Sequence, residues 1–480
     1  MLEDEDRALL RRVGAYLEVA RELAQQERQP TTTPLGLVIS AHLGVDASTL
    51  PVVQETIAEH RLIDADIALE ILAQDGDGSL IGVSGGEQRM HMSFGELIRN
   101  MHMAFEPGPV DYAERATGPR GTRRVVTVGV RLLRFGGAPI AVLQRAASRR
   151  HGRESAVLEV VGEDPDAVTA FLARLRAVML EHSVLRGQIL SFVPTQFGPE
   201  AGVTFVARPS VGADEVILPD GLLDEVVRHV IGIGEHRAML QAAGQHLKRG
   251  VLLYGPPGTG KTLTVRHLLA RTESTVVLLS GPGIRFVTAA AEIARTFPPA
   301  IVVLEDIDLV AMERGPSPQP LLFEVLEALD GLDGDADVAF VMTTNRADVL
   351  ERALAERPGR VDLAVEVPLP GRAERERLYR HYSRGLAFGE EALARSAEET
   401  EGVTASFAKE LVRRSVLRAA ARGRAVSDAD LDAAREELMS ARQGLTRRVL
   451  GGNGEDPGGA AQPPGASNPR QFGEFRGFPG

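Results

Sequence analysis

Residues 254–262, with the sequence YGPPGTGKT, constrain the fold of this chain more than any other stretch. They follow a short apolar run that is typical of a buried strand, and a helix is predicted to begin near Lys261. Glycines let backbone N–H groups close around phosphate oxygens, and a helix N-terminus presents its positive end to the same anion. A strand, a Gly-rich loop and a helix in this order predict a nucleotide-binding α/β domain.

The loop and the first helical turn supply the predicted nucleotide-binding residues. Lys261 can bridge the β- and γ-phosphates, and Thr262 offers a hydroxyl to Mg²⁺. The full predicted set is Gly255, Pro256, Pro257, Gly258, Thr259, Gly260, Lys261, Thr262 and Leu263.

A second polar feature follows the apolar run in residues 300–310, AIVVLEDIDLV. The run predicts a buried strand that ends at two carboxylates, Glu305 and Asp306. One carboxylate would hold Mg²⁺ through water, and the other would orient, and even deprotonate, an attacking water. The alternative interpretation is a solvated strand end without a ligand.

Two further segments carry candidate catalytic residues. The strand predicted over FVMTTN ends at Asn345, where a polar side chain can contact a ligand at the carboxyl edge of a sheet, or cap a helix. The segment ERPGRVD places Arg357 and Arg360 around a Pro-Gly turn. Their guanidinium groups can neutralise charge on a transferring phosphoryl group, or form an ordinary surface salt-bridge loop.

These four segments, in this order, resemble the AAA family of ATPases (AAA+ superfamily) over residues 215–440. They correspond to the Walker A, Walker B, sensor 1 and arginine-finger motifs, and TEGVTASFAKELVRRS (400–415) resembles the lid motif. The resemblance implies a P-loop NTPase core with a parallel five-stranded sheet and a C-terminal helical lid. It also implies ATP and Mg²⁺ as cofactors and a homo-hexameric ring in which Arg357 and Arg360 act on a neighbour's ATP.

The acidic strand end departs from the family pattern, because Glu305-Asp306 replaces Asp-Glu. Position for position, Glu305 takes the Mg²⁺ role and Asp306 the catalytic role. The run LEDID is usual in the mitochondrial Rieske-protein assembly translocases, and LEALDGLDG resembles the same branch. We therefore expect active hydrolysis.

Other departures concern the lid, the pore and the N-terminal region. Ala405-Ser406 replaces the usual Gly-Ala of the lid motif. Residues 278–294 are too short for the usual aromatic pore loop, and Phe286 is either a pore residue or a core residue. No membrane anchor is predicted at the N-terminus, and the layout resembles actinobacterial AAA proteins of unknown role, with an unassigned N-domain.

The chain is predicted to contain several regions. They are a helical N-terminal region (1–105), a linker (106–124), a small α+β domain (125–210), the AAA α/β core (211–371), the helical lid (372–445) and a disordered Gly/Pro-rich tail (446–480).

The net charge, the cysteine content and the length of the apolar runs limit the classes of function that this chain can have. The formal net charge is −12, which disfavours a general nucleic-acid binder, and the absence of cysteine excludes disulfides and thiolate metal sites. The first residues, MLEDEDRALLRR, lack an apolar export segment, and no apolar run reaches the roughly 18–20 residues that span a bilayer. We therefore expect a cytoplasmic protein without a membrane partner.

The leading hypothesis is a ring-forming, chaperone-like ATPase that couples hydrolysis to remodelling of a protein substrate of unknown identity. Two alternatives remain open. One is an ATP-binding assembly scaffold with little turnover, and the other is a DNA-acting AAA+ motor. No HExxH motif is present, which excludes a fused zinc protease of the membrane AAA type.

Overall fold

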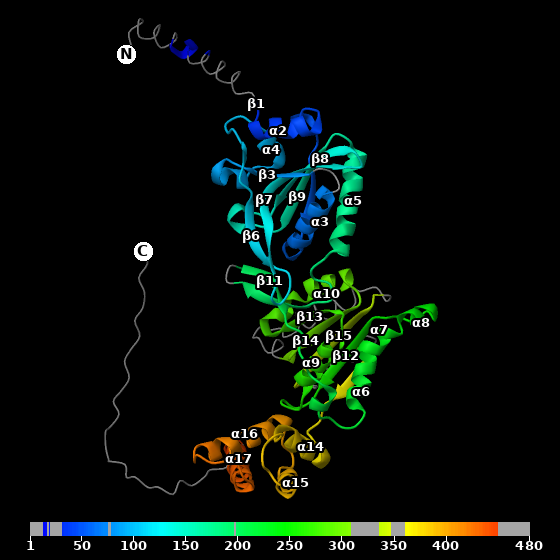
Figure 1. Ribbon diagram of the computed structural model, residues 1–480, viewed down its shortest axis with the longest axis vertical. Helices are drawn as coiled ribbons and strands as arrows, with labels where there is room; N and C mark the ends of the chain where they lie inside the picture. The colour runs from blue at the N-terminus through cyan, green and yellow to red at the C-terminus, as the bar shows by residue number, and fades with distance from the viewer. Residues whose placement is uncertain are drawn as a thin grey trace, which may run out of the picture. The chain divides into compact units, whose positions relative to one another are not determined.

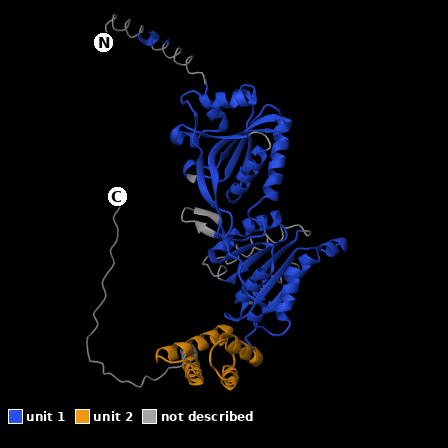
Figure 2. Ribbon diagram, viewed as in Figure 1, with its two compact units in different colours: residues 1–370 blue, residues 371–480 orange. Residues whose placement is uncertain are grey.

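The computed structural model of the 480-residue chain describes residues 13–16, 19, 31–74, 78–195, 198–308, 336–346 and 361–449. The chain divides into two compact units, residues 1–370 and residues 371–480, which Figure 2 distinguishes by colour. Among the helices in the described ranges, none combines the length and apolar character needed to cross a bilayer.

The N-terminal part of the first unit is built on an antiparallel sheet. Its strands follow the order β2-β9-β8-β7-β3-β5, and β6 pairs with β7. The strands are β2 (Val53–Ile57), β3 (Ser79–Val83), β5 (Pro107–Gly108), β6 (Asp111–Ala116), β7 (Thr122–Phe135), β8 (Ala138–Arg145) and β9 (Ala156–Gly162). A short ribbon of β1 (Thr31–Thr32) and β4 (Arg99–Asn100) lies outside this sheet.

Helices cover both faces of this antiparallel sheet (Figure 1). Successive strand residues point to opposite faces, so Val142 and Val160 pack with α3 (Leu62–Gln74) and α5 (Pro165–Glu181). Their neighbours on the opposite face pack with α2 (Pro34–Leu43) and α4 (Phe94–Ile98); these neighbours are Ala141, Leu143 and Val161. The two apolar clusters hold the sheet between its helices.

The second sheet of this unit follows the order β11-β10-β13-β14-β15-β12-β16. All neighbouring strands are parallel except β10 and β11. The strands are β10 (Ile189–Thr195), β11 (Gly198–Val206), β12 (Arg249–Tyr254), β13 (Thr275–Ser280), β14 (Ala300–Glu305), β15 (Val338–Thr344) and β16 (Leu363–Glu366). The prediction of five strands is wrong in number, because β10 and β11 extend the sheet beyond β13.

Helices also lie on both faces of the parallel sheet. Apolar residues of α6 (Leu222–Val227), the π-helical turn at Arg228–Gly232 and α9 (Lys261–Arg271) pack against one face. The helix α10 (Val287–Thr296) packs against the other face. Two short helices, α7 (Ile233–Glu235) and α8 (Arg237–Ala242), precede β12. Burial on both faces explains why these strands read as continuous apolar runs.

The element boundaries differ from the sequence prediction in three places. The strands β10 and β11 belong to the sheet of parallel strands, whereas the sequence placed their residues in the preceding α+β domain. The predicted helical region contains β2 and β3, and the predicted linker contains β6. Alternating apolar residues show that a segment is a strand, but the pattern does not show which sheet the strand joins.

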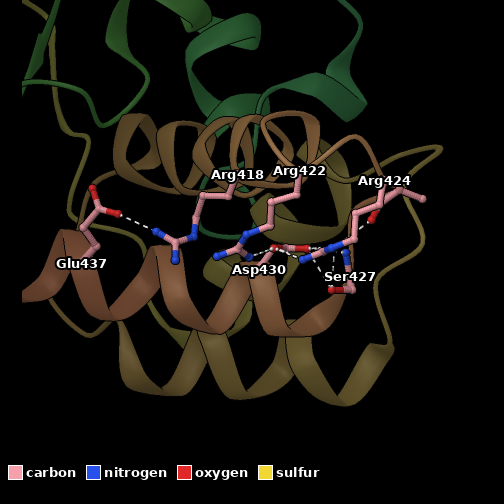
Figure 3. A network of polar contacts seen from close by, with 7 residues as sticks. Arg418, Arg422, Arg424, Ser427, Asp430 and Glu437 are labelled. Carbon is pink, nitrogen blue, oxygen red and sulfur yellow. Dashed lines mark hydrogen bonds and ion pairs between the residues drawn. The ribbon is translucent and has the colours of Figure 1, made fainter.

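The second unit is helical. It contains α14 (Arg372–Tyr382), α15 (Glu390–Glu399), α16 (Ala405–Ala420) and α17 (Asp428–Val449). Asp430 is 1% exposed, and its carboxylate accepts hydrogen bonds from both Nη atoms of Arg424 and from the Ser427 hydroxyl (Figure 3). These bonds, those of Arg424 first, hold the pKa of Asp430 well below its usual range. The network ties the start of α17 to the segment that follows α16.

Candidate nucleotide site

The carboxyl ends of three parallel strands bring the predicted site residues together. β14, β15 and β12 are neighbours in the sheet, and Tyr254 at the end of β12 pairs with Thr344 at the end of β15. The Gly-rich loop follows β12, Glu305 ends β14, and Asn345 follows β15. In a parallel sheet this edge is where ligands bind, so the local motifs of the sequence meet there.

Two loop glycines have backbone conformations that other residues rarely adopt. Gly255 has φ +139°, and a Cβ at this position would lie 2.3 Å from the carbonyl oxygen of Val367. Gly260 has φ +117° and is the N-cap of α9. The loop can therefore turn sharply from β12 into α9 only with glycine at these points.

The other loop residues complete the turn. Thr259 is 2% exposed, and its hydroxyl donates to the Pro256 carbonyl at 2.9 Å. Pro257 and Gly258 are exposed, and Gly258 has φ +77°. Leu263 packs against the apolar cluster beneath α9. The exposed tip of the loop leaves its backbone accessible to a phosphate group.

Lys261 is the first residue of α9, and it is 5% exposed. Its ammonium group donates to the carbonyl oxygens of Gly255 and Pro256, at 2.8 and 2.9 Å. Burial lowers its pKa, and the nearby carboxylates of Asp306 and Asp308 oppose that change. The ammonium group is thus held inside the curve of the loop, beside the acidic end of β14.

Glu305 and Thr262 contact one another across this edge. The Thr262 hydroxyl donates to the Glu305 carboxylate, which is half-buried. Burial raises the pKa of Glu305, the neighbouring Asp306 raises it further, and Arg266 and Thr262 lower it. Because desolvation disfavours the charged form of Glu305, a cation bound at this place would stabilise the carboxylate.

Asp306 has a left-handed backbone conformation, with φ +52°, and is the one such non-glycine residue in the described ranges. Aspartate tolerates this conformation better than most side chains. Its N–H donates to the Thr343 hydroxyl at 2.9 Å, and its Oδ1 accepts from Asn345 Nδ2 at 3.3 Å. The turn aims the Asp306 carboxylate toward Asn345, the residue that follows the neighbouring strand β15.

Asp308 also lies at the carboxyl end of the parallel strands, although no role is predicted for it from the sequence. It is 7% exposed, and its Oδ1 accepts from the Thr344 hydroxyl at 2.9 Å and from the Asn345 backbone N–H at 3.1 Å. The run LEDID could have indicated this role. Asp306 and Asp308 alternate directly after a buried strand, so both side chains can point toward the end of the sheet. Asp308 positions Asn345, which in turn contacts Asp306.

This donor set fits a magnesium nucleotide. The buried ammonium group, the exposed loop backbone and the N-terminus of α9 suit phosphate oxygens, and the Thr262 hydroxyl with the Glu305 carboxylate suits a hard divalent cation. Arg357 and Arg360, the predicted arginine fingers, lie outside the described residues. Phe286 packs against the apolar core and stacks on Phe192, with ring centroids 5.4 Å apart, which agrees with the core alternative for this residue.

Comparison with known proteins finds a family model that matches the residues of this site. Residues 251–369 match the ATPase family associated with various cellular activities (AAA). This stretch of the chain is similar to the ATPase domain of that family. Its loop, its acidic strand end and Asn345 all lie within the matched residues.

Three relatives share this part of the chain. The proteasome-activating nucleotidase 1 of Halobacterium salinarum is 30% identical over 254 residues, which is 48% of this chain and 62% of the relative. The proteasome-activating nucleotidase of Methanothermobacter thermautotrophicus is 33% identical over 45% of this chain and 57% of the relative. The 26S protease regulatory subunit 6A of Caenorhabditis elegans is 31% identical over 45% of this chain and 54% of the relative. The chain thus spans less than two thirds of each relative.

Proposed function

We propose that this protein is a ring-forming ATPase that hydrolyses Mg-ATP and uses the energy to remodel a protein substrate or complex. The observation that carries this proposal is that one edge of the parallel sheet holds the buried Lys261 ammonium group near Asp306, together with the Glu305 carboxylate that ends β14. A phosphate-binding loop alone would bind a nucleotide. The carboxylates beside it add the groups that hydrolysis needs.

Each residue has a distinct role in the proposed reaction. Lys261 neutralises the β- and γ-phosphates, and Thr262 and Glu305 hold Mg²⁺, which when bound supplies positive charge to the same oxygens. Asp306 orients the attacking water and accepts its proton. Asn345 holds the Asp306 carboxylate through the hydrogen bond described above.

The ring is the part of the proposal that depends on Arg357 and Arg360. These residues would reach the ATP of the next subunit and neutralise charge on the transferring phosphoryl group. The run LEDID and the residues around Asn345 support the resemblance to the Rieske-protein assembly branch. The relatives are named for activating the proteasome or regulating a protease, which supports a protein substrate.

Mixing two inactive variants tests the shared site. Lys261→Ala removes the phosphate contact, and Arg360→Ala removes the contact to the neighbour, so each variant alone should turn over ATP poorly. In a random equal mixture, about a quarter of the junctions pair an intact nucleotide half with an intact arginine half. We expect partial recovery of steady-state ATPase activity in the mixture.

The matched control mixes Arg360→Ala with the Lys261→Ala/Arg360→Ala double variant, which restores no junction. Sedimentation must first show that the chains assemble in both mixtures. If the ATPase activity of the test mixture then equals that of the control mixture, each chain hydrolyses ATP without a residue from its neighbour. The scaffold alternative predicts a different result for the unmodified protein, which would release about one phosphate per site and then stop.

A further inference from the structure

A cleft of about 580 Å³ lies within the first unit. It is separate from the nucleotide edge, which we define as the carboxyl ends of β12, β14 and β15 with the candidate nucleotide residues. Phe297, which follows α10, and the residues of β2 and α5 line it. Phe297 directly precedes the segment that starts β14, whereas Glu305 ends that strand. The cleft therefore lies near the amino ends of the parallel strands, whereas the candidate nucleotide residues lie at their carboxyl ends.

One wall of the cleft is the edge strand of the antiparallel sheet. Within the described residues, β2 pairs with β9 alone, and Glu55, Thr56, Ile57 and Ala58 line the cleft. Every second residue of an antiparallel edge strand directs its N–H and C=O away from its partner. The outer edge of β2 can therefore accept another extended chain.

The other walls combine apolar and basic groups. Leu180 on α5 is 36% exposed, and Met179 and Ile293 lie beside the cleft. Three arginines and two glutamates line it, and Arg176 and Glu55 neutralise each other through hydrogen bonds of 2.7 and 2.6 Å. Burial lowers the pKa of His60 to about 4, so this wall residue adds no charge near neutral pH. The lining carries a positive surplus in a chain whose net charge is −12.

Arg61 lines the cleft and forms an ion pair with Asp64. Its Nε and Nη2 are buried without a hydrogen-bond acceptor among the described residues, and the carboxylate of Asp64 lies 3.6 Å from Nε. Its guanidinium group lies over the Phe297 ring, with Cζ 5.6 Å from the centroid. The stacking fixes the guanidinium group beside the cleft. The Arg61 side chain is 23% exposed, so a carboxylate of a bound ligand would approach its accessible part there and not its buried Nε and Nη2.

We propose that this cleft binds an extended segment of a partner polypeptide that carries an acidic side chain. The segment would pair with the free edge of β2, place an apolar side chain against Leu180 and place its carboxylate on Arg61. This inference goes beyond the proposed function, because the surface is separate from the nucleotide residues and binding there needs no ATP.

Fluorescence anisotropy of the full chain without nucleotide tests the inference. The probes are dye-labelled peptides of alternating Thr and Val with a central Glu, or with Lys in its place. We expect saturable binding of the Glu peptide and binding of the Lys peptide that is weaker by about tenfold or more, the effect of losing one charge-assisted hydrogen bond. Arg61→Gln should remove this preference, and Leu180→Asp should weaken binding of both peptides.

The matched control is Met239→Asp on α8, because Met239 is an exposed apolar residue, 67% exposed, that does not line the cleft. Absence of saturable binding, equal affinity for the two peptides, or equal losses in Met239→Asp and Leu180→Asp would overturn the inference. A change in oligomeric state with Leu180→Asp, without loss of peptide binding, would show instead that copies of the chain meet at this cleft. An ATPase that fails while peptides still bind would overturn only the proposed function.

Discussion

The two seven-stranded sheets of the first unit place their polar groups differently. The parallel sheet gathers Lys261, Glu305 and Asp306 at the carboxyl edge of its strands. The antiparallel sheet instead buries charged residues within its layers, and Glu159 and Arg145 form an ion pair in which both residues are about 95% buried. One sheet thus groups charged residues at its strand ends, as the proposed nucleotide site requires, whereas the other pairs charged residues inside its own layers.

The largest expected effect comes from Lys261→Ala, which removes the buried cation of the nucleotide edge. We expect ATP affinity to fall by about a thousandfold, because the phosphates lose their closest positive charge. Calorimetric titration with Mg-ATP measures this affinity. Arg134→Ala on β7 is the control, since Arg134 is exposed and lies on the antiparallel sheet instead of the parallel one. Equal affinity for Mg-ATP in Lys261→Ala and in the control would contradict the contrast between the two sheets, because the charged edge of the parallel sheet would then not bind the nucleotide.

Glu159→Gln should destabilise the antiparallel sheet by about 3 kcal/mol, because the change leaves Arg145 buried and unpaired. Glu159 also accepts the N–H of Phe94 at 3.1 Å, so the start of α4 should loosen as well. Hydrogen exchange of the β8 and β9 amides measures the free energy of local opening.

The control for this variant is Glu181→Gln, because the Arg174–Glu181 pair is about half exposed on both sides and should cost below about 0.5 kcal/mol. Affinity for ATP should stay unchanged in both variants. A loss of ATP affinity with Glu159→Gln, without faster exchange in β8 and β9, would mean that the two sheets do not divide their roles.

A smaller effect should appear in the pH dependence of Mg²⁺ binding. Burial and the neighbouring Asp306 raise the pKa of Glu305 above its ordinary value, so protons should compete with Mg²⁺ at a higher pH than for an exposed glutamate. Mg²⁺-dependent affinity for ATP should therefore fall as the pH falls through this raised pKa. Asp306→Asn removes one cause of the increase and should move the acid limb to lower pH. An acid limb that stays in place would show that Asp306 does not raise the pKa of the group that competes with Mg²⁺ for protons.

The nucleotide edge could be predicted from the sequence because its residues lie in short local motifs. A glycine loop needs its own backbone geometry, and the carboxylates directly follow a buried strand, so no knowledge of distant contacts is required. Asn345 was predicted for the same reason. The role of Arg357 and Arg360 stays a prediction, because both lie outside the described residues.

The rest of the first unit could not be predicted as well, because it depends on contacts between distant segments. The strands β10 and β11 have ordinary strand patterns. Only the pairing of β10 with β13, which begins at Ile189 and Val276, places β10 in the parallel sheet. Asp308 was missed because its partner, Thr344, lies 36 positions away. The Glu159–Arg145 pair was hidden for a similar reason, since an acidic residue in a strand pattern indicates a solvent-facing position.

The central claim is that the carboxylate of Asp306 acts on a nucleotide that the Gly-rich loop binds. The most direct measurement compares ATP affinity and single-turnover hydrolysis in Asp306→Asn. Asparagine tolerates the left-handed backbone at this position, so the variant should fold without added strain. We predict affinity within about twofold of the unmodified protein and hydrolysis slower by about a hundredfold. Hydrolysis at the unmodified rate would contradict the account.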